Sequence, residues 1–119
     1  MTINPIRVAI NGYGNLGRGV EKAVLAAPDM ELVAIFTRRD PQQLDTVSGK
    51  AVSIKDMPDY KDKVDVCVNC GGSATDLMEQ GPAVTAYFNT VDSFDTHAKI
   101  PEHYADMDKV AHDNGHVAV

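Results

Sequence analysis

The sequence lacks the features that would place it in a membrane, on nucleic acid or in a secretory pathway. It has no run of about 18 consecutive apolar residues, so no segment is expected to span a bilayer. Residues 1–5 contain no basic region that leads into an apolar stretch, so no signal peptide is indicated. The formal net charge of -6 disfavours nucleic acid or an anionic membrane as the main partner. A cytoplasmic location is the default expectation.

Cysteine is also scarce, since the chain carries only Cys67 and Cys70. Their C-x-x-C spacing suits a redox pair or half of a zinc site. Zinc would need two further ligands at matching spacing, and the four histidines show no such pairing. Because Cys67 lies inside an apolar run rather than at a helix start, we expect both cysteines to be buried as small hydrophobic side chains, and no metal site.

Apolar runs of strand length alternate with helix-like spacings along the 119 residues, which suffice for one domain. Strands are predicted at 6–10, 32–36, 64–69, 88–92 and 116–119, and helices at 16–27, 73–86 and 101–114. The link at 38–63 shows little regular structure, with one short helix near 41–44 and one short strand at 51–54. This alternation predicts an α/β fold of the Rossmann type, a doubly wound parallel sheet in three α/β/α layers.

Local residue choices support the predicted helices. The spacing of three and four predicts that the first helix buries one apolar face, made of Leu16, Val20, Ala23, Val24 and Ala27. Ser73 and Asp76 resemble a capping box at the start of the second helix. Pro101 suits the first turn of the third helix, and Gly115 suits its end.

A glycine-rich segment, Gly12-Tyr13-Gly14-Asn15-Leu16-Gly17, fits the pattern G-x-G-x-x-G between the first strand and first helix. Gly12 would make the tight turn, Gly14 would let the backbone approach a pyrophosphate, and Gly17 would let the helix pack on the strand. The free N–H groups of the helix start would then face the phosphates. The context predicts a dinucleotide site, although a simple strand-to-helix turn remains the alternative.

The end of the second strand indicates which dinucleotide is bound. NAD-binding domains usually place an acid there, about 20 residues after the loop, to bind the ribose 2′-hydroxyl. Here the strand ends in Phe36-Thr37-Arg38-Arg39, and two guanidinium groups would instead bind a 2′-phosphate. The sequence therefore predicts NADP, with solvated loop arginines as the alternative and the nearby Asp40 as a weakening feature.

Unusual residues also follow the other predicted strands, where ligands of open parallel sheets bind. The strand at 64–69 is followed by small residues at 70–75. The strand at 88–92 leads into residues 92–97, which gather two carboxylates, an aromatic ring and an imidazole. Asp92 and Asp95 suit either turn capping or a catalytic role, as a ligand for a cationic substrate group or as a proton acceptor. His97 is expected to be structural rather than catalytic.

Taken together, these segments resemble the meso-diaminopimelate dehydrogenase family. The resemblance rests on the glycine loop, on Arg38-Arg39, on the Gly-Ser-Ala-Thr-Asp stretch at 72–76 and on the Val-Asp-x-x-Asp-x-His segment at 91–97. It implies an NADP-dependent oxidative deamination at the D-centre of an amino acid, and a homodimer in the full-length form. Gly71 and the 40–63 segment depart from the family pattern.

The same resemblance implies specific site residues. The substrate amino group would meet Asp95, with Asp92 beside it. The implied cofactor contacts are Gly12, Tyr13, Gly14, Asn15, Leu16, Gly17, Thr37, Arg38, Arg39, Cys70, Gly71, Gly72, Ser73, Ser93, Phe94 and Asp95. Family members continue past Val119 into a substrate domain, so residues 1–119 are expected to be a truncated NADP-binding domain with negligible turnover alone. The alternatives are a homoserine dehydrogenase-like or dihydrodipicolinate reductase-like enzyme, or a non-catalytic NADP-binding module.

Overall fold

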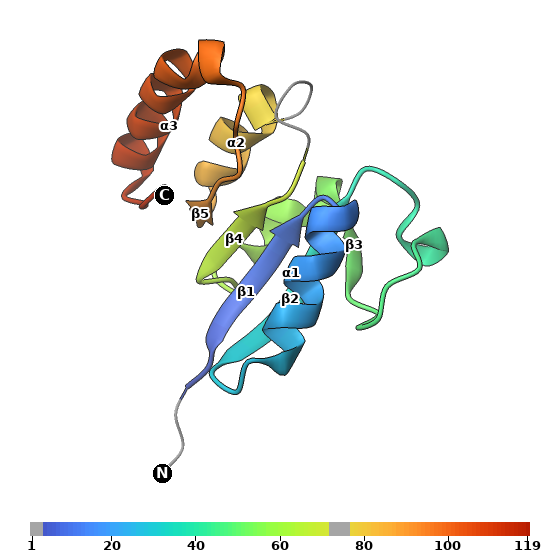
Figure 1. Ribbon diagram of the computed structural model, residues 1–119. Coiled ribbons are helices and arrows are strands. Elements are labelled where there is room, and N and C mark those ends of the chain that lie inside the picture. The colour runs from blue at the N-terminus through green and yellow to red at the C-terminus, as the bar shows by residue number, and fades with distance from the viewer. Residues whose placement is uncertain (1–3, 72–76) are drawn as a thin grey trace.

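The central element of the structure is a parallel sheet (Figure 1). The computed structural model describes residues 4–71 and 77–119, and within them five strands pair in the order β3-β2-β1-β4-β5, all parallel. The strands are β1 (Ile6–Asn11), β2 (Met30–Thr37), β3 (Ala51–Ser53), β4 (Val66–Asn69) and β5 (Asn89–Val91). The α-helices are α1 (Asn15–Ala26), α2 (Leu77–Thr85) and α3 (Ile100–Asn114). This strand order is that of the Rossmann fold, so the predicted fold class is confirmed.

The two faces of the sheet carry separate apolar clusters. On one face, Val24 of α1 packs with Val8, Ile10 and Ile35 of β1 and β2. On the other, Val84 of α2 belongs to a cluster with Ala9, Ala34, Phe36, Cys67 and Phe88. Alternate strand residues thus point to opposite faces and both are covered, as in doubly wound folds.

The buried face of α1 differs from the predicted one. Its buried residues are Gly17, Glu21 and Val24, whereas Leu16 is 49% exposed and Ala23 is also exposed. The helix is therefore turned so that a carboxylate, rather than a continuous apolar row, faces inward. The prediction was correct for Val24 and for Val20, which packs against the core, but wrong for Leu16 and Ala23, because it counted only apolar side chains. Glu21 is buried with hydrogen-bond donors from a distant loop.

The residues at the two ends of α3 have the roles that were predicted from their residue types. Pro101 lies in the first turn of α3, and Gly115 ends that helix in the left-handed conformation with φ 69°, as predicted. The proposed capping residues Ser73 and Asp76 lie outside the described residues. For this reason α2 is described only from Leu77.

Two chain segments depart from the expected secondary structure. The short helix predicted near 41–44 is a 3₁₀ turn at Pro41–Gln43, but the link also contains a longer 3₁₀ helix at Ile54–Tyr60 that the sequence did not indicate. Its Met57 is buried against the sheet, and Pro58 inside the turn masked the helical pattern. At the other end, residues 116–119 run parallel to β5, but only Ala118 forms a bridge, to Thr90.

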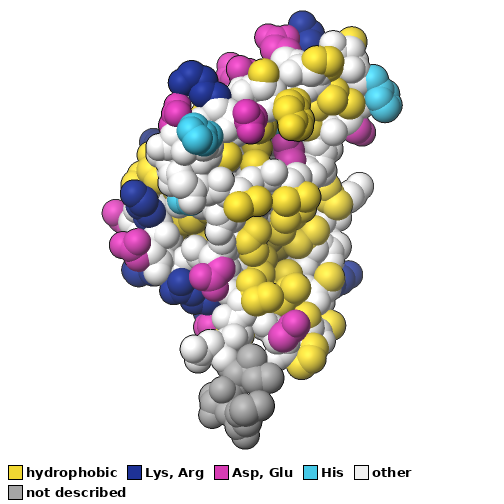
Figure 2. All heavy atoms as spheres, turned by 90° about the vertical axis from the view of Figure 1, so that its left-hand side faces the viewer, with side chains coloured by type: hydrophobic (Ala, Val, Ile, Leu, Met, Phe, Trp, Pro, Cys, Tyr) yellow, Lys and Arg dark blue, Asp and Glu magenta, His cyan; other side chains and the backbone are white. Residues whose placement is uncertain are grey.

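One side of the molecule is markedly apolar. Figure 2, which views the molecule from the left of Figure 1, shows apolar side chains gathered along the middle of that face. Exposed apolar residues near the β5 edge include Val91, Val117 and Val119, and Val66 and Val68 of β4 are only partly buried. None of the helices in the described part of the chain is long and apolar enough to cross a membrane.

Candidate dinucleotide-binding site

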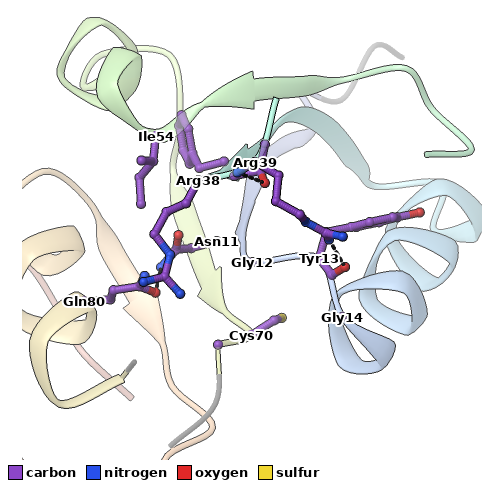
Figure 3. A pocket seen from close by; sticks show the side chains of 12 residues that line it. Asn11, Gly12, Tyr13, Gly14, Arg38, Arg39, Ile54, Cys70 and Gln80 are labelled. Atoms are coloured by element: carbon purple, nitrogen blue, oxygen red, sulfur yellow. Dashed lines mark hydrogen bonds between the residues drawn. The ribbon is translucent and has the colours of Figure 1, made fainter. Parts of the chain in front are cut away.

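A pocket lies at the carboxyl ends of β1, β2 and β4, where the topology predicts a ligand (Figure 3). Eight of its lining residues were predicted as cofactor contacts: Gly12, Tyr13, Gly14, Thr37, Arg38, Arg39, Cys70 and Gly71. Four others were not predicted: Asn11, Phe36, Ile54 and Gln80. The first and last of these residues, Asn11 and Gln80, are 69 positions apart in the sequence. They meet because the strands are parallel and their carboxyl ends lie at the same edge of the sheet.

The three glycines of the loop have different surroundings. Gly12 has φ +96°, a conformation that favours glycine, and an added Cβ would lie 3.2 Å from the Gly71 nitrogen. A Cβ on Gly17 would lie 2.3 Å from the Gly12 carbonyl oxygen, so only glycine allows α1 to start this close to β1. A Cβ on Gly14 would meet nothing within 4 Å. Gly12 and Gly17 are needed by the fold, whereas Gly14 borders open space beside the start of α1.

The two arginines after β2 reach in different directions (Figure 3). Arg39 Nη2 donates to the Tyr13 carbonyl oxygen at 2.9 Å, and its backbone N–H donates to Thr37 Oγ1 at 3.0 Å. Arg38 instead extends along the pocket toward Gln80. Both are exposed at the surface. The site thus has a strongly basic rim beside the glycine loop.

Tyr13 of the glycine loop is tied to a buried carboxylate. The Tyr13 hydroxyl donates to Glu21 Oε1 at 2.5 Å, while the Ser48 N–H and hydroxyl donate to Glu21 Oε2 at 2.9 and 2.7 Å. Burial alone would raise the pKa of Glu21, but the hydrogen bonds from Tyr13 and Ser48 outweigh it and leave the pKa below its usual range. Burial, followed by the bond to Glu21, raises the pKa of Tyr13. Glu21 is therefore ionised and Tyr13 is its donor.

Side chains also connect the ends of β1, β4 and β5. Asn11 Nδ2 donates to Asn69 Oδ1 at 3.4 Å and to Gln80 Oε1 at 3.2 Å. The Ser93 hydroxyl donates to the Asn69 carbonyl oxygen at 2.9 Å. Asn69 Nδ2 is buried and has no hydrogen-bond partner among the described residues. Ser93 is thereby held beside the pocket, although it does not line it.

The carboxylates after β5 lie in unlike surroundings. Asp92 Oδ2 is hydrogen-bonded to His103 Nε2, and the two side chains are only 12% and 6% exposed. The Phe94 ring is stacked on the His103 ring at 4.1 Å between centroids. Asp95 and His97 are exposed. The buried histidine of this cluster is therefore His103, which the sequence analysis did not single out.

Of the two cysteines, Cys70 lines the pocket and Cys67 lies within β4. Cys67 and Cys70 are both free and buried, which confirms that they act as small hydrophobic side chains. Burial raises the pKa of Cys70 to about 11, and burial with the neighbouring Cys70 raises the pKa of Cys67 still further. Neither thiol is activated for redox chemistry. Among the described residues, no group of three His, Cys, Asp or Glu side chains is placed to hold a metal ion.

The structure brings together most of the predicted site, but not all of it. Gly72 and Ser73 lie outside the described residues. Asn15, Leu16 and Gly17 form the start of α1 without lining the pocket, and Ser93, Phe94 and Asp95 lie at the neighbouring strand end. A polar residue ending a strand directly before Gly12 was a usable signal for Asn11. Nothing local signals Ile54 or Gln80, which are brought in by tertiary structure.

Searches against known proteins identify close relatives, although no protein-family model matches. A meso-diaminopimelate D-dehydrogenase of Ureibacillus thermosphaericus is 54% identical over 118 residues, which is 98% of this chain and 36% of that protein. Among solved structures, an engineered D-amino acid dehydrogenase bound to NADP⁺ superimposes with a TM-score of 0.91 and 47% identity, over 97% of this chain and 35% of that one.

A C. glutamicum DAP dehydrogenase in complex with DAP gives a TM-score of 0.90 and 46% identity, over 98% of this chain and 35% of that one. A homoserine dehydrogenase of S. aureus shares the fold, with a TM-score of 0.69, but only 16% identity. The chain spans about a third of the length of the curated relatives that it matches. The resemblance predicted from the sequence is confirmed: over nearly all of its residues, this chain is similar to part of the meso-diaminopimelate dehydrogenases.

Proposed function

We propose that this chain is a single NADP-binding domain and that the pocket beside Gly12 to Gly14 holds the dinucleotide. The open space at Gly14 leaves room for a pyrophosphate, and the free N–H groups at the start of α1 supply donors for it. A dinucleotide therefore fits the residues that line this pocket. The observation that carries the proposal is the combination of this loop with two arginines, and no acid, at the tip of β2.

Selection of NADP over NAD is assigned to Arg38 and Arg39. A ribose bound over the loop places its 2′ position near the tip of β2, where these guanidinium groups would meet a 2′-phosphate. Each hydrogen bond to a charged group contributes about 1.5–3 kcal/mol, which corresponds to roughly ten- to a hundred-fold in affinity. The similar engineered D-amino acid dehydrogenase was solved with NADP⁺ bound, which supports the assignment.

For the longer protein we propose the activity of its relatives, reversible oxidative deamination at the D-centre of meso-diaminopimelate. NADP⁺, when bound, supplies the acceptor for a hydride from the substrate. Asp95 is exposed at the end of β5 and would bind the substrate amino group, with Ser93 and Phe94 alongside it. Asp92 is held by His103 and would act by adding negative charge and by shaping the loop. The same resemblance supports a cytoplasmic homodimer.

Calorimetric titration of the chain with NADPH and NADH tests the cofactor assignment. The wild-type chain is expected to bind NADPH at least tenfold more tightly than NADH, since one charged hydrogen bond accounts for about that factor. Arg38→Ala should reduce this preference about tenfold, the effect of one charged hydrogen bond, whereas Lys109→Ala on the distant helix α3 should leave it intact. Equal affinities for the two dinucleotides in the wild-type chain would refute the assignment.

The role of Asp95 requires a protein of the relatives' full length. Asp95→Ala is expected to raise KM for the amino acid or lower kcat while the affinity for NADPH stays near normal. A loss of NADPH affinity alone would place Asp95 in the cofactor site instead. The homoserine dehydrogenase-like alternative has only the shared fold behind it.

A further inference from the structure

Glu21 is an unusual residue for the buried face of a helix. Its side chain is fully buried in α1, yet it has no cationic partner among its hydrogen bonds, which come from Tyr13, Val47 and Ser48. Burying a carboxylate costs several kcal/mol unless every lone pair finds a donor. If position 21 served packing alone, an apolar side chain would fill it better. The prediction of an apolar face on α1 rested on that expectation.

The donor on the pocket side of Glu21 is Tyr13, and Tyr13 is restrained at three points. Its hydroxyl is held by Glu21, the Arg18 guanidinium lies 4.7 Å from its ring centroid, and its carbonyl oxygen accepts from Arg39 Nη2 at 2.9 Å. The ring is only 5% exposed. The position of the Tyr13 carbonyl therefore depends on the hydrogen bond that the Tyr13 hydroxyl donates to Glu21.

This chain of contacts leads from the helix interior to the basic rim of the site. Arg39 adopts its orientation across the glycine loop because the Tyr13 carbonyl receives one of its N–H groups (Figure 3). An arginine carries five N–H donors, so those not used by Tyr13 stay available to an anion. If Tyr13 shifts, Arg39 loses its anchor and its flexible side chain no longer points to one place.

We propose that Glu21 is a positioning residue for dinucleotide selection, which acts through Tyr13 to hold Arg39 where the 2′-phosphate binds. The inference rests on the proposed NADP site. It adds a specificity determinant that does not line the pocket. The other three bonds, donated by the Val47 N–H and by the Ser48 N–H and hydroxyl, anchor the loop after the 3₁₀ turn and are a separate, structural role of the same carboxylate.

The test measures the NADPH and NADH affinities of matched variants by calorimetry. Glu21→Gln places an amide among donors, and Tyr13→Phe removes only the hydroxyl. Each is expected to reduce the preference for NADPH about tenfold, the effect of one misplaced charged hydrogen bond. Ser48→Ala loses the two hydroxyl bonds on the loop side, one to Glu21 and one from the Lys50 N–H, and should keep the wild-type preference. If Glu21→Gln fails to fold, Tyr13→Phe tests the proposal on its own.

The same variants combined with Arg39→Ala separate positioning from general damage. If Glu21 acts through Arg39, Glu21→Gln or Tyr13→Phe changes the NADPH preference no further once Arg39 is absent. An unchanged preference in the single variants, or an equal loss in the Arg39→Ala background, would overturn the inference. A wild-type chain without preference for NADPH would instead overturn the proposed function, and this inference with it.

Discussion

His103 of α3 holds Asp92 at the end of β5, through a hydrogen bond between Nε2 and Oδ2 that is nearly closed off from solvent. The Phe94 ring covers the imidazole by stacking on it. Sequence reasoning grouped Asp92 with Asp95 as equivalent carboxylates. Their surroundings separate them, because one is fixed to a helix and the other is exposed.

Removing His103 is expected to destabilise the chain strongly. His103→Ala leaves the Asp92 carboxylate without its partner in a buried setting and removes the ring that Phe94 covers, which should lower the free energy of unfolding by about 3 kcal/mol. Urea denaturation measures this change. Lys109→Ala, which breaks the exposed pair with Asp113, is the control and should have little effect. A His103→Ala chain as stable as that control would contradict the assigned role.

Two glycines in the same helix should respond oppositely to alanine. Gly17→Ala forces a methyl group to 2.3 Å from the Gly12 carbonyl oxygen, so the start of α1 must move and stability should fall by about 3 kcal/mol or more. Gly19 has nothing within 4 Å of an added Cβ. Gly19→Ala should stabilise the chain by about 1 kcal/mol, because alanine favours the helix interior. Thermal unfolding of both variants decides the matter, and equal effects would refute the geometric explanation.

Gly14→Ala should separate binding from folding. The position is open, so the free energy of unfolding should stay within about 0.5 kcal/mol of wild type. The added methyl group would stand where a phosphate approaches the loop, and we expect at least a tenfold loss of NADPH affinity, equivalent to about 1.4 kcal/mol. Calorimetric titration alongside urea unfolding gives both values. Retained affinity would show that the phosphate does not pass near Gly14.

The buried thiols should make stability fall in alkaline solution. Cysteines of the unfolded chain ionise near pH 8.5, whereas burial raises the pKa of Cys70 to about 11 and that of Cys67 further. The folded chain therefore keeps protons that the unfolded chain loses as the pH rises above about 8.5. Between pH values of about 8.5 and 9.5, each thiol should cost about 1 kcal/mol of stability.

Urea unfolding at a series of pH values measures this alkaline loss of stability. Cys70→Ala should halve the loss that the two thiols cause. The native chain should also react slowly with a thiol reagent until it unfolds. Rapid modification at neutral pH would mean that the sulfur atoms are more accessible than their 0% and 8% residue exposures imply.

The parts of the fold that local chemistry controls were predictable from the sequence. Gly12, Pro101 and Gly115 each occupy the conformation that their residue type favours, and β1, β2 and β4 were visible as apolar runs. Features that depend on distant partners were not predictable. The buried carboxylate of Glu21 depends on Ser48, and the 3₁₀ helix at Ile54–Tyr60 depends on packing of Met57 against the sheet.

The candidate site shows the same division. The glycine loop and Arg38 could be placed because a motif and a strand end fix their positions. Gln80 and His103 could not, since each comes from a helix whose angle to the sheet is set by tertiary packing. Hydrophobic periodicity identifies the elements but carries no information on which polar side chains meet across them.

The bond between Arg39 and the Tyr13 carbonyl has a consequence for attempts to re-engineer the cofactor preference. Because one guanidinium braces the loop and, in the proposed site, would also meet the 2′-phosphate, exchanging it for an acid would introduce a charge that repels that same carbonyl. A conversion to NAD would therefore need a second change that supports Tyr13 from another direction. Substitution at Arg38, whose side chain extends along the pocket toward Gln80, is the more tractable place to begin.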